Sequence, residues 1–191
     1  MSIPQYDRKI SYADYLSWTG DEPFEIINGI PYNMSPSPST KHQQVSMNLS
    51  YQLMDFFKDK NCHVFAAPFD VRLLAEEKSD DEVFHVVQPD LSVICDEHKL
   101  DKKGCVGSPD LIIEIISPSS AKMDRMRKRD LYEKALVKEY WIVDPQNELI
   151  EIYNLNQENH YGKPLFFSLE DTVESIFFHE LKIDGKEIFK F

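Results

Sequence analysis

The chain is short of basic residues: 21 lysines and arginines stand against 33 aspartates and glutamates, and the formal net charge is −12. Proteins that coat nucleic acid or anionic membranes neutralise phosphates with lysine and arginine. The composition excludes that mode of binding, so any contact with nucleic acid must be local. No apolar run approaches the roughly 20 residues that span a bilayer, and the start, Met1 to Asp7, has neither a basic head nor an apolar core. We therefore expect a soluble, cytoplasmic protein without a membrane partner.

Three further kinds of site lack the residues that they need. The cysteines Cys62, Cys95 and Cys105 are odd in number and widely spaced, which predicts reduced thiols rather than a disulfide framework. Cys95, His98 and Cys105 have no fourth ligand at a spacing that suits zinc. The six glycines form no phosphate-cradling loop, and there is no Gly-x-Ser-x-Gly elbow of a serine hydrolase.

What the chain does have is a carboxylate inside an apolar run. With 191 residues, 42% of them hydrophobic, we expect a single domain over 1–191. Within it, the isoleucine-rich segment Pro109 to Pro118 predicts a buried strand, and Glu114 lies in its middle. A bare ionised carboxylate is costly to bury, so a basic side chain, hydrogen-bond donors or a metal ion must compensate Glu114.

A second Pro-Asp-Leu opens the next upstream apolar run, Pro89 to Cys95. If the two strands are neighbours in one sheet, Asp90 and Glu114 point the same way and can share a divalent cation. Ligation by oxygen alone suits Mg²⁺ or Mn²⁺. The alternative is that Pro-Asp merely forms the turn before a strand.

Other segments have clear periodicity. Ser11 is expected to cap a short helix ending at Leu16, and Asn28-Gly29 predicts a hairpin over 24–32 with Glu25 on its first strand. A long helix is expected from Thr40 to Lys58. Its apolar face carries, in chain order, Val45, Leu49, Gln52, Leu53 and Phe56, with His42 at the start of the same face. Strands are expected over 64–66 and 69–74, joined by a turn at Pro68.

The second half predicts a helix capped by Ser119 or Ser120 and running to about Leu136. One stripe of this helix holds Lys128, Leu131, Tyr132 and Ala135, and the opposite, charged face holds Lys122, Arg125, Arg129 and Glu133. A strand pair over 139–145 and 149–153 follows. Short strands over 163–191 are expected to close the sheet, which makes the fold class mixed α/β.

The ordered set of these segments resembles the bacterial Uma-two endonuclease-like family, a branch of the PD-(D/E)XK nuclease superfamily. The resemblance covers roughly residues 10 to 155. It is carried by Glu25-Ile26-Ile27-Asn28-Gly29, Ser39 with His42, Pro89-Asp90-Leu91, Ser108 to Ser119, Asp124 with Lys128, Tyr132, and Glu139-Tyr140-Trp141. It implies a restriction-endonuclease-like fold, a mixed sheet flanked by helices, with Asp90 and Glu114 as metal ligands.

The chain departs from the family's pattern at two places. The superfamily motif has a lysine two residues after the acid, where this chain has Ile116, and the usual glycine before the Glu-Tyr-Trp strand is absent at 135–137. Since isoleucine cannot position an attacking water, a basic group must come from elsewhere. Lys128 is the best candidate, because a helix packed over its preceding strand could aim this side chain at the metal.

The leading hypothesis is therefore a Mg²⁺- or Mn²⁺-dependent DNA endonuclease. Asp90 and Glu114 hold the metal, Lys128 acts on the water, Glu25 and His42 support the site, and Arg125, Arg127 and Arg129 contact phosphates. Two alternatives remain: a catalytically silent binding or assembly module, and a metal-dependent hydrolase of a small phosphorylated substrate. Because sheet edges need covering and related nucleases often act as pairs, a homodimer is also expected.

Overall fold

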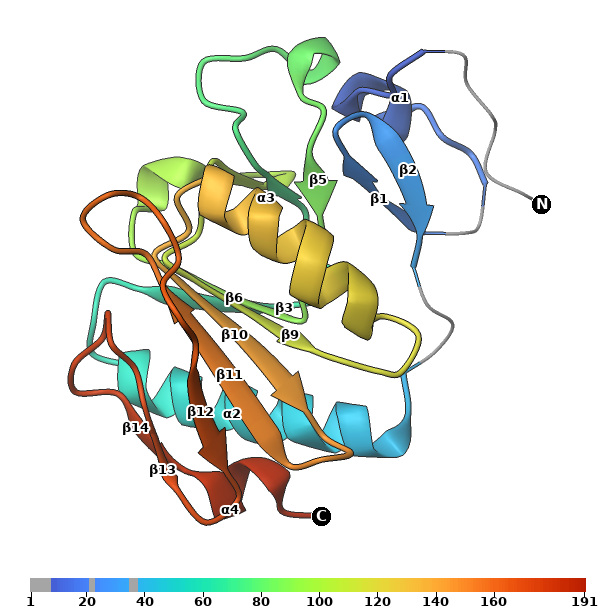
Figure 1. Cartoon of the computed structure of the whole chain (residues 1–191). Helices are drawn as coiled ribbons and strands as arrows, with labels where there is room; N and C mark the ends of the chain where they lie inside the picture. The colour runs from blue at the N-terminus through green and yellow to red at the C-terminus, as the bar shows by residue number, and fades with distance from the viewer. Residues whose placement is uncertain (1–7, 21–22, 35–37) are drawn as a thin grey trace.

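The computed structural model describes residues 8–20, 23–34 and 38–191. Its central sheet has six strands, in the order β12 (Leu165–Ser168), β11 (Leu149–Asn154), β10 (Glu139–Asp144), β9 (Leu111–Ile115), β6 (Leu91–Ile94) and β3 (His63–Ala66). The second sheet has the order β2 (Ile30–Asn33), β1 (Phe24–Ile27), β5 (Val86–Val87), β4 (Val71–Arg72), β8 (Gly104–Val106) and β7 (Leu100–Asp101). Figure 1 shows β1 and β2 beside the central sheet, on the side where its strands β9 and β6 lie.

The helices are short apart from one. They are α1 (Tyr12–Leu16), α2 (Thr40–Phe57), α3 (Arg129–Lys134) and α4 (Gly185–Phe189), with 3₁₀ turns η1 (Asp80–Glu82) and η2 (Glu97–Lys99) and a π-helix η3 (Met123–Lys128). Helix α2 covers one face of the central sheet and α3 the other (Figure 1). No helix among the described residues is long and apolar enough to cross a membrane.

Strand β9 is the middle of the molecule. It pairs in parallel with β10 and antiparallel with β6, and all of its residues are buried. Its side chains alternate between two cores: Ile113 and Ile115 pack on the α2 side, whereas Ile112 packs on the α3 side. The mixed α/β fold, the buried strand and the pairing of the two Pro-Asp strands are thus confirmed.

Several local predictions are confirmed by the backbone. The side chain of Ser11 caps α1, and the hairpin turns at Asn28 and Gly29, whose φ angles are 54° and 74°. Positive φ at both positions is what a tight hairpin turn requires, and asparagine and glycine accept it readily. Ser39 caps α2, which ends at Phe57, and the buried end of its apolar face is Phe57 rather than Phe56.

The strands predicted around Pro68 differ from expectation. The expected strand over 69–74 shortens to β4 and belongs to the second sheet, whereas β3 belongs to the central sheet. The charged loop 96–103 also contains a strand, β7, which pairs with β8. Strand β8 begins at Gly104, whose φ is 131° and where an added Cβ would clash with the carbonyl oxygen of Asp70. The sequence did not predict this hairpin, because the segment is polar and β7 lacks the alternation of apolar residues that indicates a strand.

The expectation for the C-terminal segment is correct only in part. Strand β12 extends the central sheet, but β13 (Thr172–Glu174) and β14 (Lys182–Asp184) pair with each other instead. Helix α4 was not predicted. It lies beside α2, where the amide of Asn48 donates to the carbonyl oxygens of Ile188 and Lys190 at 3.1 and 2.9 Å.

The prediction of three reduced cysteines is wrong for two of them. Cys62 and Cys95 form a disulfide, while Cys105 is free and buried. The pairing of His63 with Ile94 places Cys62 directly across from Cys95 on neighbouring strands. The separation of 33 residues in the sequence hides this proximity, because only the register of β3 on β6 reveals it.

His85 makes the stability of the second sheet sensitive to acid. Burial, followed by the charges of Lys134, Lys78 and Lys9, lowers the pKa of His85 to about 4. Its Nδ1 accepts the backbone N–H of Asn28 at 3.1 Å, so the ring must be neutral there. The unfolded chain takes up this proton near the ordinary pKa of about 6.5, well before the folded chain does.

We therefore expect the free energy of unfolding to fall as pH drops from about 6.5 to 4 through His85, with no further change below. The His85→Gln variant lacks this titrating group and so loses its contribution to the pH dependence of stability. The melting temperature of the variant should therefore vary less than that of the wild type over the same pH range. Parallel curves for the two proteins between pH 7 and 4 would contradict the assignment.

Candidate active site

Asp90 and Glu114 face each other at one end of the β6–β9 pair. Leu91 of β6 pairs with Ile113 of the antiparallel strand β9, so one residue further along Asp90 lies opposite Glu114. Asp90 Oδ2 accepts the backbone N–H of Ile115 at 2.7 Å, which fixes its carboxylate beside the acid-bearing strand. The two acids therefore lie together because each Pro-Asp strand begins where its antiparallel neighbour ends.

The other Pro-Asp dipeptide makes the same backbone contact at the opposite end of the pair. Asp110 Oδ2 accepts the N–H of Cys95 at 2.8 Å, and Asp110 Oδ1 accepts from Lys138 Nζ at 2.6 Å. Here the carboxylate has a lysine partner and holds two strands in register. Asp110 is thus a structural counterpart of Asp90.

Lys128 reaches the acids from the helical side of the sheet. Its Nζ donates to Glu25 Oε1 at 2.8 Å and to Glu114 Oε1 at 2.9 Å, and lies 3.8 Å from Asp124 Oδ1. The Lys128, Glu25 and Glu114 side chains are only 7%, 8% and 6% exposed. The structure thus brings Glu25, Glu114 and Lys128 into one buried cluster.

Lys128 lies on a π-helical segment of the expected helix. Within η3 the N–H of Arg129 donates to the carbonyl of Asp124, five residues back, and the hydroxyl of Tyr140 donates to the same carbonyl at 3.2 Å. A side chain that enters the helical ladder in this way is a known cause of such distortion, and π segments are frequent at functional sites. Both Asp124 and Lys128 face inward from this segment.

Two further residues contact the cluster but were not assigned to it from the sequence. Tyr132 donates its hydroxyl to Glu114 Oε1 at 2.6 Å, although the sequence indicated only a packing role. The backbone N–H of Gln88 donates to Glu25 Oε1 at 2.8 Å, and the Gln88 side chain is held by Asp70 at 2.7 Å. Gln88 lies two residues before Asp90, so one short segment carries Asp90 and also binds Glu25. No sequence pattern signalled Gln88, because its contact uses the main chain.

His42 lies at the N-terminal end of α2, next to Asp90. Its Nε2 is 3.3 Å from Asp90 Oδ1. Burial lowers the pKa of His42, but the hydrogen bond to Asp90 and the negative charge of Asp90 outweigh it, so the pKa lies above its ordinary value. The other nitrogen, Nδ1, is buried without a hydrogen-bond partner within the part of the chain that the structure describes.

The cluster carries more negative than positive charge. Burial raises the pKa of Glu114 most, the Lys128 ammonium lowers it, and the neighbouring acids Asp124, Asp90 and Glu25 raise it again, to well above its ordinary value. Burial likewise raises the pKa of Asp124 above its ordinary value. Although burial alone would lower the pKa of Lys128, these carboxylates raise it, so Lys128 stays charged. A cation added to this site would therefore be electrostatically favoured.

The donors suit a hard divalent ion that needs few protein ligands. No group of three or more His, Cys, Asp or Glu side chains in the described ranges is arranged to hold a metal. Mg²⁺, however, usually keeps several waters and binds one or two carboxylates together with substrate phosphates. Asp90 and Glu114 are two such carboxylates, and the excess of negative charge around them fits this kind of site.

The three arginines of the helical segment differ in how they are held. Arg125 Nε donates to Glu151 Oε1 at 2.8 Å, and Arg129 Nη1 donates to Asp130 at 2.8 Å. These two guanidinium groups are therefore tied to acids of the protein itself. Arg127 is exposed.

Comparisons with known proteins agree with this architecture. A solved structure described as “a putative nuclease belonging to DUF820”, from Anabaena variabilis, superposes with a TM-score of 0.74 and 19% identity, covering 94% of this chain and 97% of that one. An uncharacterized protein of Synechocystis sp. is 24% identical over 156 residues, which is 80% of this chain and 78% of that protein. Residues 12–184 match the Uma2 family, described as “Putative restriction endonuclease”. On the strength of that match, the chain belongs to the Uma2 family, as the sequence motifs predicted.

Proposed function

We propose that the protein is a Mg²⁺- or Mn²⁺-dependent endonuclease that hydrolyses phosphodiester bonds in DNA. The observation that carries the proposal is the pairing of Asp90 with Glu114 at the mouth of two adjacent strands, with the Lys128 ammonium 2.9 Å from Glu114. Membership of a restriction-endonuclease family supports it. Asp90 and Glu114 would hold the ion, which when bound supplies an activated water and stabilises the leaving oxygen.

The other residues of the cluster have separate tasks. The carboxylates of Glu25 and Glu114 both bind the Lys128 ammonium, so the position of the ammonium is fixed. From there Lys128 orients the attacking water and offsets charge on the phosphate. Tyr132 fixes the Glu114 carboxylate, and His42 fixes Asp90 through its Nε2. Lys128 thereby takes the part that a lysine at position 116 would have; Ile116 instead packs in the apolar core.

We propose that the arginines contribute to phosphate binding to different degrees. Arg127 is exposed, whereas Arg125 and Arg129 must exchange a bond with an acid of the protein before they contact a phosphate. Arg127 is therefore the leading contact, and the acidic chain as a whole confines binding to a short stretch of DNA.

The test is cleavage of supercoiled, linear duplex and single-stranded DNA in manganese, in magnesium and in EDTA. We expect cleavage in the metal-containing reactions that is lost in Asp90→Asn and Glu114→Gln. Asp110→Asn is the matched control, since it changes the other Pro-Asp dipeptide without touching the cluster. Cleavage that is independent of metal, or that persists in Asp90→Asn, would refute the proposal.

The recessed position of the cluster also favours one alternative, a small phosphorylated substrate that can enter where a duplex cannot. Turnover of a small phosphodiester such as bis(p-nitrophenyl) phosphate, with DNA left intact, would establish that reading. If neither substrate is turned over and manganese does not bind, the catalytically silent module remains.

We also propose a homodimer, because β12 and β3 are the outer strands of the central sheet and sheet edges tend to be covered. Light scattering over a concentration series should give about twice the 22.3 kDa chain mass. A monomer at every concentration would exclude the dimer.

A further inference from the structure

A pair of side chains, the half-buried Tyr32 and the exposed Arg127, lies next to the buried cluster. The guanidinium carbon of Arg127 is 5.0 Å from the centre of the Tyr32 ring. Tyr32 is registered directly across from Glu25 on the β1–β2 hairpin, and Arg127 immediately precedes Lys128. The Glu25–Lys128 ion pair is thus accompanied by a second contact between the same two elements, made by Tyr32 and Arg127.

The cluster itself is reached mainly from the side of Asp90. The Asp90 side chain is 22% exposed and His42 is 14% exposed, compared with 6% for Glu114 and 7% for Lys128. A phosphate must therefore be brought down to a recessed site. A flexible single strand can bend to do so, whereas a duplex is stiff over many base pairs, and unstacking one of its bases costs a few kcal/mol.

An arginine held against an aromatic ring is well suited to binding a base. Guanidinium groups stack on flat π systems, and base-to-side-chain stacking is the usual way in which proteins hold unpaired strands without reading sequence. Stacking also requires little positive charge, which agrees with a net charge of −12.

We propose that Tyr32 and Arg127 form a stacking platform for an unpaired nucleobase beside the cleaved phosphate, so that the preferred substrate is single-stranded or locally unpaired DNA. The inference rests on the proposed nuclease function, since it names the substrate form of that same site. Tyr32 supports the guanidinium, and Arg127 makes the contact with the base and with its phosphate.

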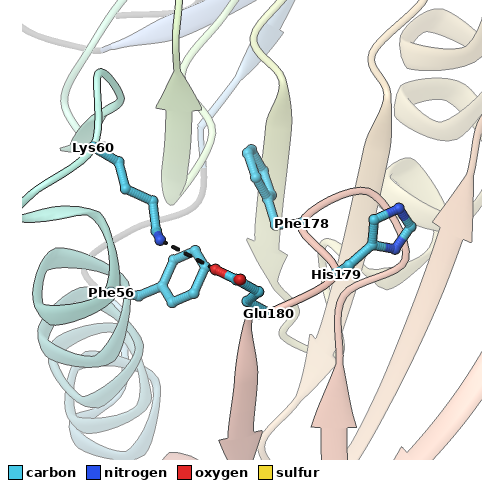
Figure 2. A pocket seen from close by; sticks show the side chains of 5 residues that line it. All are labelled: Phe56, Lys60, Phe178, His179 and Glu180. Atoms are coloured by element: carbon cyan, nitrogen blue, oxygen red, sulfur yellow. Dashed lines mark hydrogen bonds and ion pairs between the residues drawn. The ribbon is translucent and has the colours of Figure 1, made fainter.

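The chain offers a matched control at the far end of α2. Lys60 Nζ lies 4.4 Å from the centre of the Phe56 ring and 3.5 Å from Glu180 Oε2. Figure 2 shows this pair in a shallow pocket, with Phe178 alongside and His179 pointing away from the Lys60–Glu180 bond. It is the same chemistry, a cation over a ring, but Phe56 and His42 are roughly 20 Å apart along α2.

The experiment measures binding by fluorescence anisotropy in EDTA, at one salt concentration, with a labelled thymidine oligonucleotide and with the same strand in duplex form. The wild type should bind the single strand more tightly. Tyr32→Leu and Arg127→Gln should weaken this binding about tenfold, which is within the range of one lost stacking contact. Tyr32→Phe keeps the ring, and Lys60→Gln removes an equal charge elsewhere, so both should bind as the wild type does.

Equal affinity for the two DNA forms, or an equal loss in Lys60→Gln and Arg127→Gln, would overturn the platform. If Tyr32→Leu does not fold, Arg127→Gln decides, because Arg127 is exposed. Cleavage in manganese is assayed separately. Single-strand preference without any cleavage refutes the nuclease and keeps the platform, whereas cleavage with unchanged binding in Arg127→Gln refutes the platform alone.

Discussion

Lys128→Ala is expected to lower DNA cleavage by orders of magnitude while manganese binding is largely kept. The ammonium is the group that would orient the attacking water. Without it, Asp90 still accepts the backbone N–H of Ile115, and Glu114 still accepts the hydroxyl of Tyr132. The comparison is of single-turnover rates for Lys128→Ala and for Lys134→Ala, which removes an exposed lysine from the same helical segment. If Lys128→Ala cleaves as fast as the wild type, Lys128 has no catalytic role.

The same substitution should also destabilise the fold, and by an amount that depends on pH. Removing the lysine leaves Glu25 and Glu114 as buried carboxylates without their shared partner, a change that costs on the order of 3 kcal/mol. The ammonium lowers the pKa of Glu114, so its loss raises that already elevated pKa further. The folded chain then binds more protons than the unfolded chain, and stability falls as pH rises. The deficit in melting temperature should therefore be larger at pH 8 than at pH 5.

Manganese should raise the melting temperature of the wild type, and Asp90→Ala and Glu114→Ala should abolish this shift. A ligand that binds only the folded state stabilises it by about 2.7 kcal/mol when present at a hundred times its dissociation constant. Calorimetric titration gives the affinity directly and is independent of any DNA substrate. Asp110→Asn should be less stable than the wild type yet respond to manganese normally, because its carboxylate serves Cys95 and Lys138 instead.

Without metal, the two acids differ in what their removal does. Asp90→Asn relieves repulsion among close carboxylates, so the metal-free variant should be at least as stable as the wild type. Glu114→Gln also removes an ionic partner of Lys128, which offsets that gain. Equal manganese binding by wild type, Asp90→Ala and Glu114→Ala would place the ion elsewhere.

Much of the site was predictable because its residues sit on elements with strong periodicity. The apolar run around Glu114 predicted a buried strand, and the helical stripe of Leu131 and Tyr132 predicted that Lys128 faces inward. Contacts that depend on register or on the main chain were not predictable. The Cys62–Cys95 disulfide follows from the pairing of β3 with β6, and the Gln88 contact uses a backbone N–H that any residue but proline would supply.

The π-helix also determines how the buried cluster can come apart. Because Lys128 comes from η3 and not from β9, the charge balance of the acids depends on how one short helical segment is seated. A local opening of that segment would withdraw the lysine and leave β9 paired on both sides. The free energy that separates the assembled cluster from one without Lys128 is then that of a partial opening, smaller than the free energy of unfolding the whole chain.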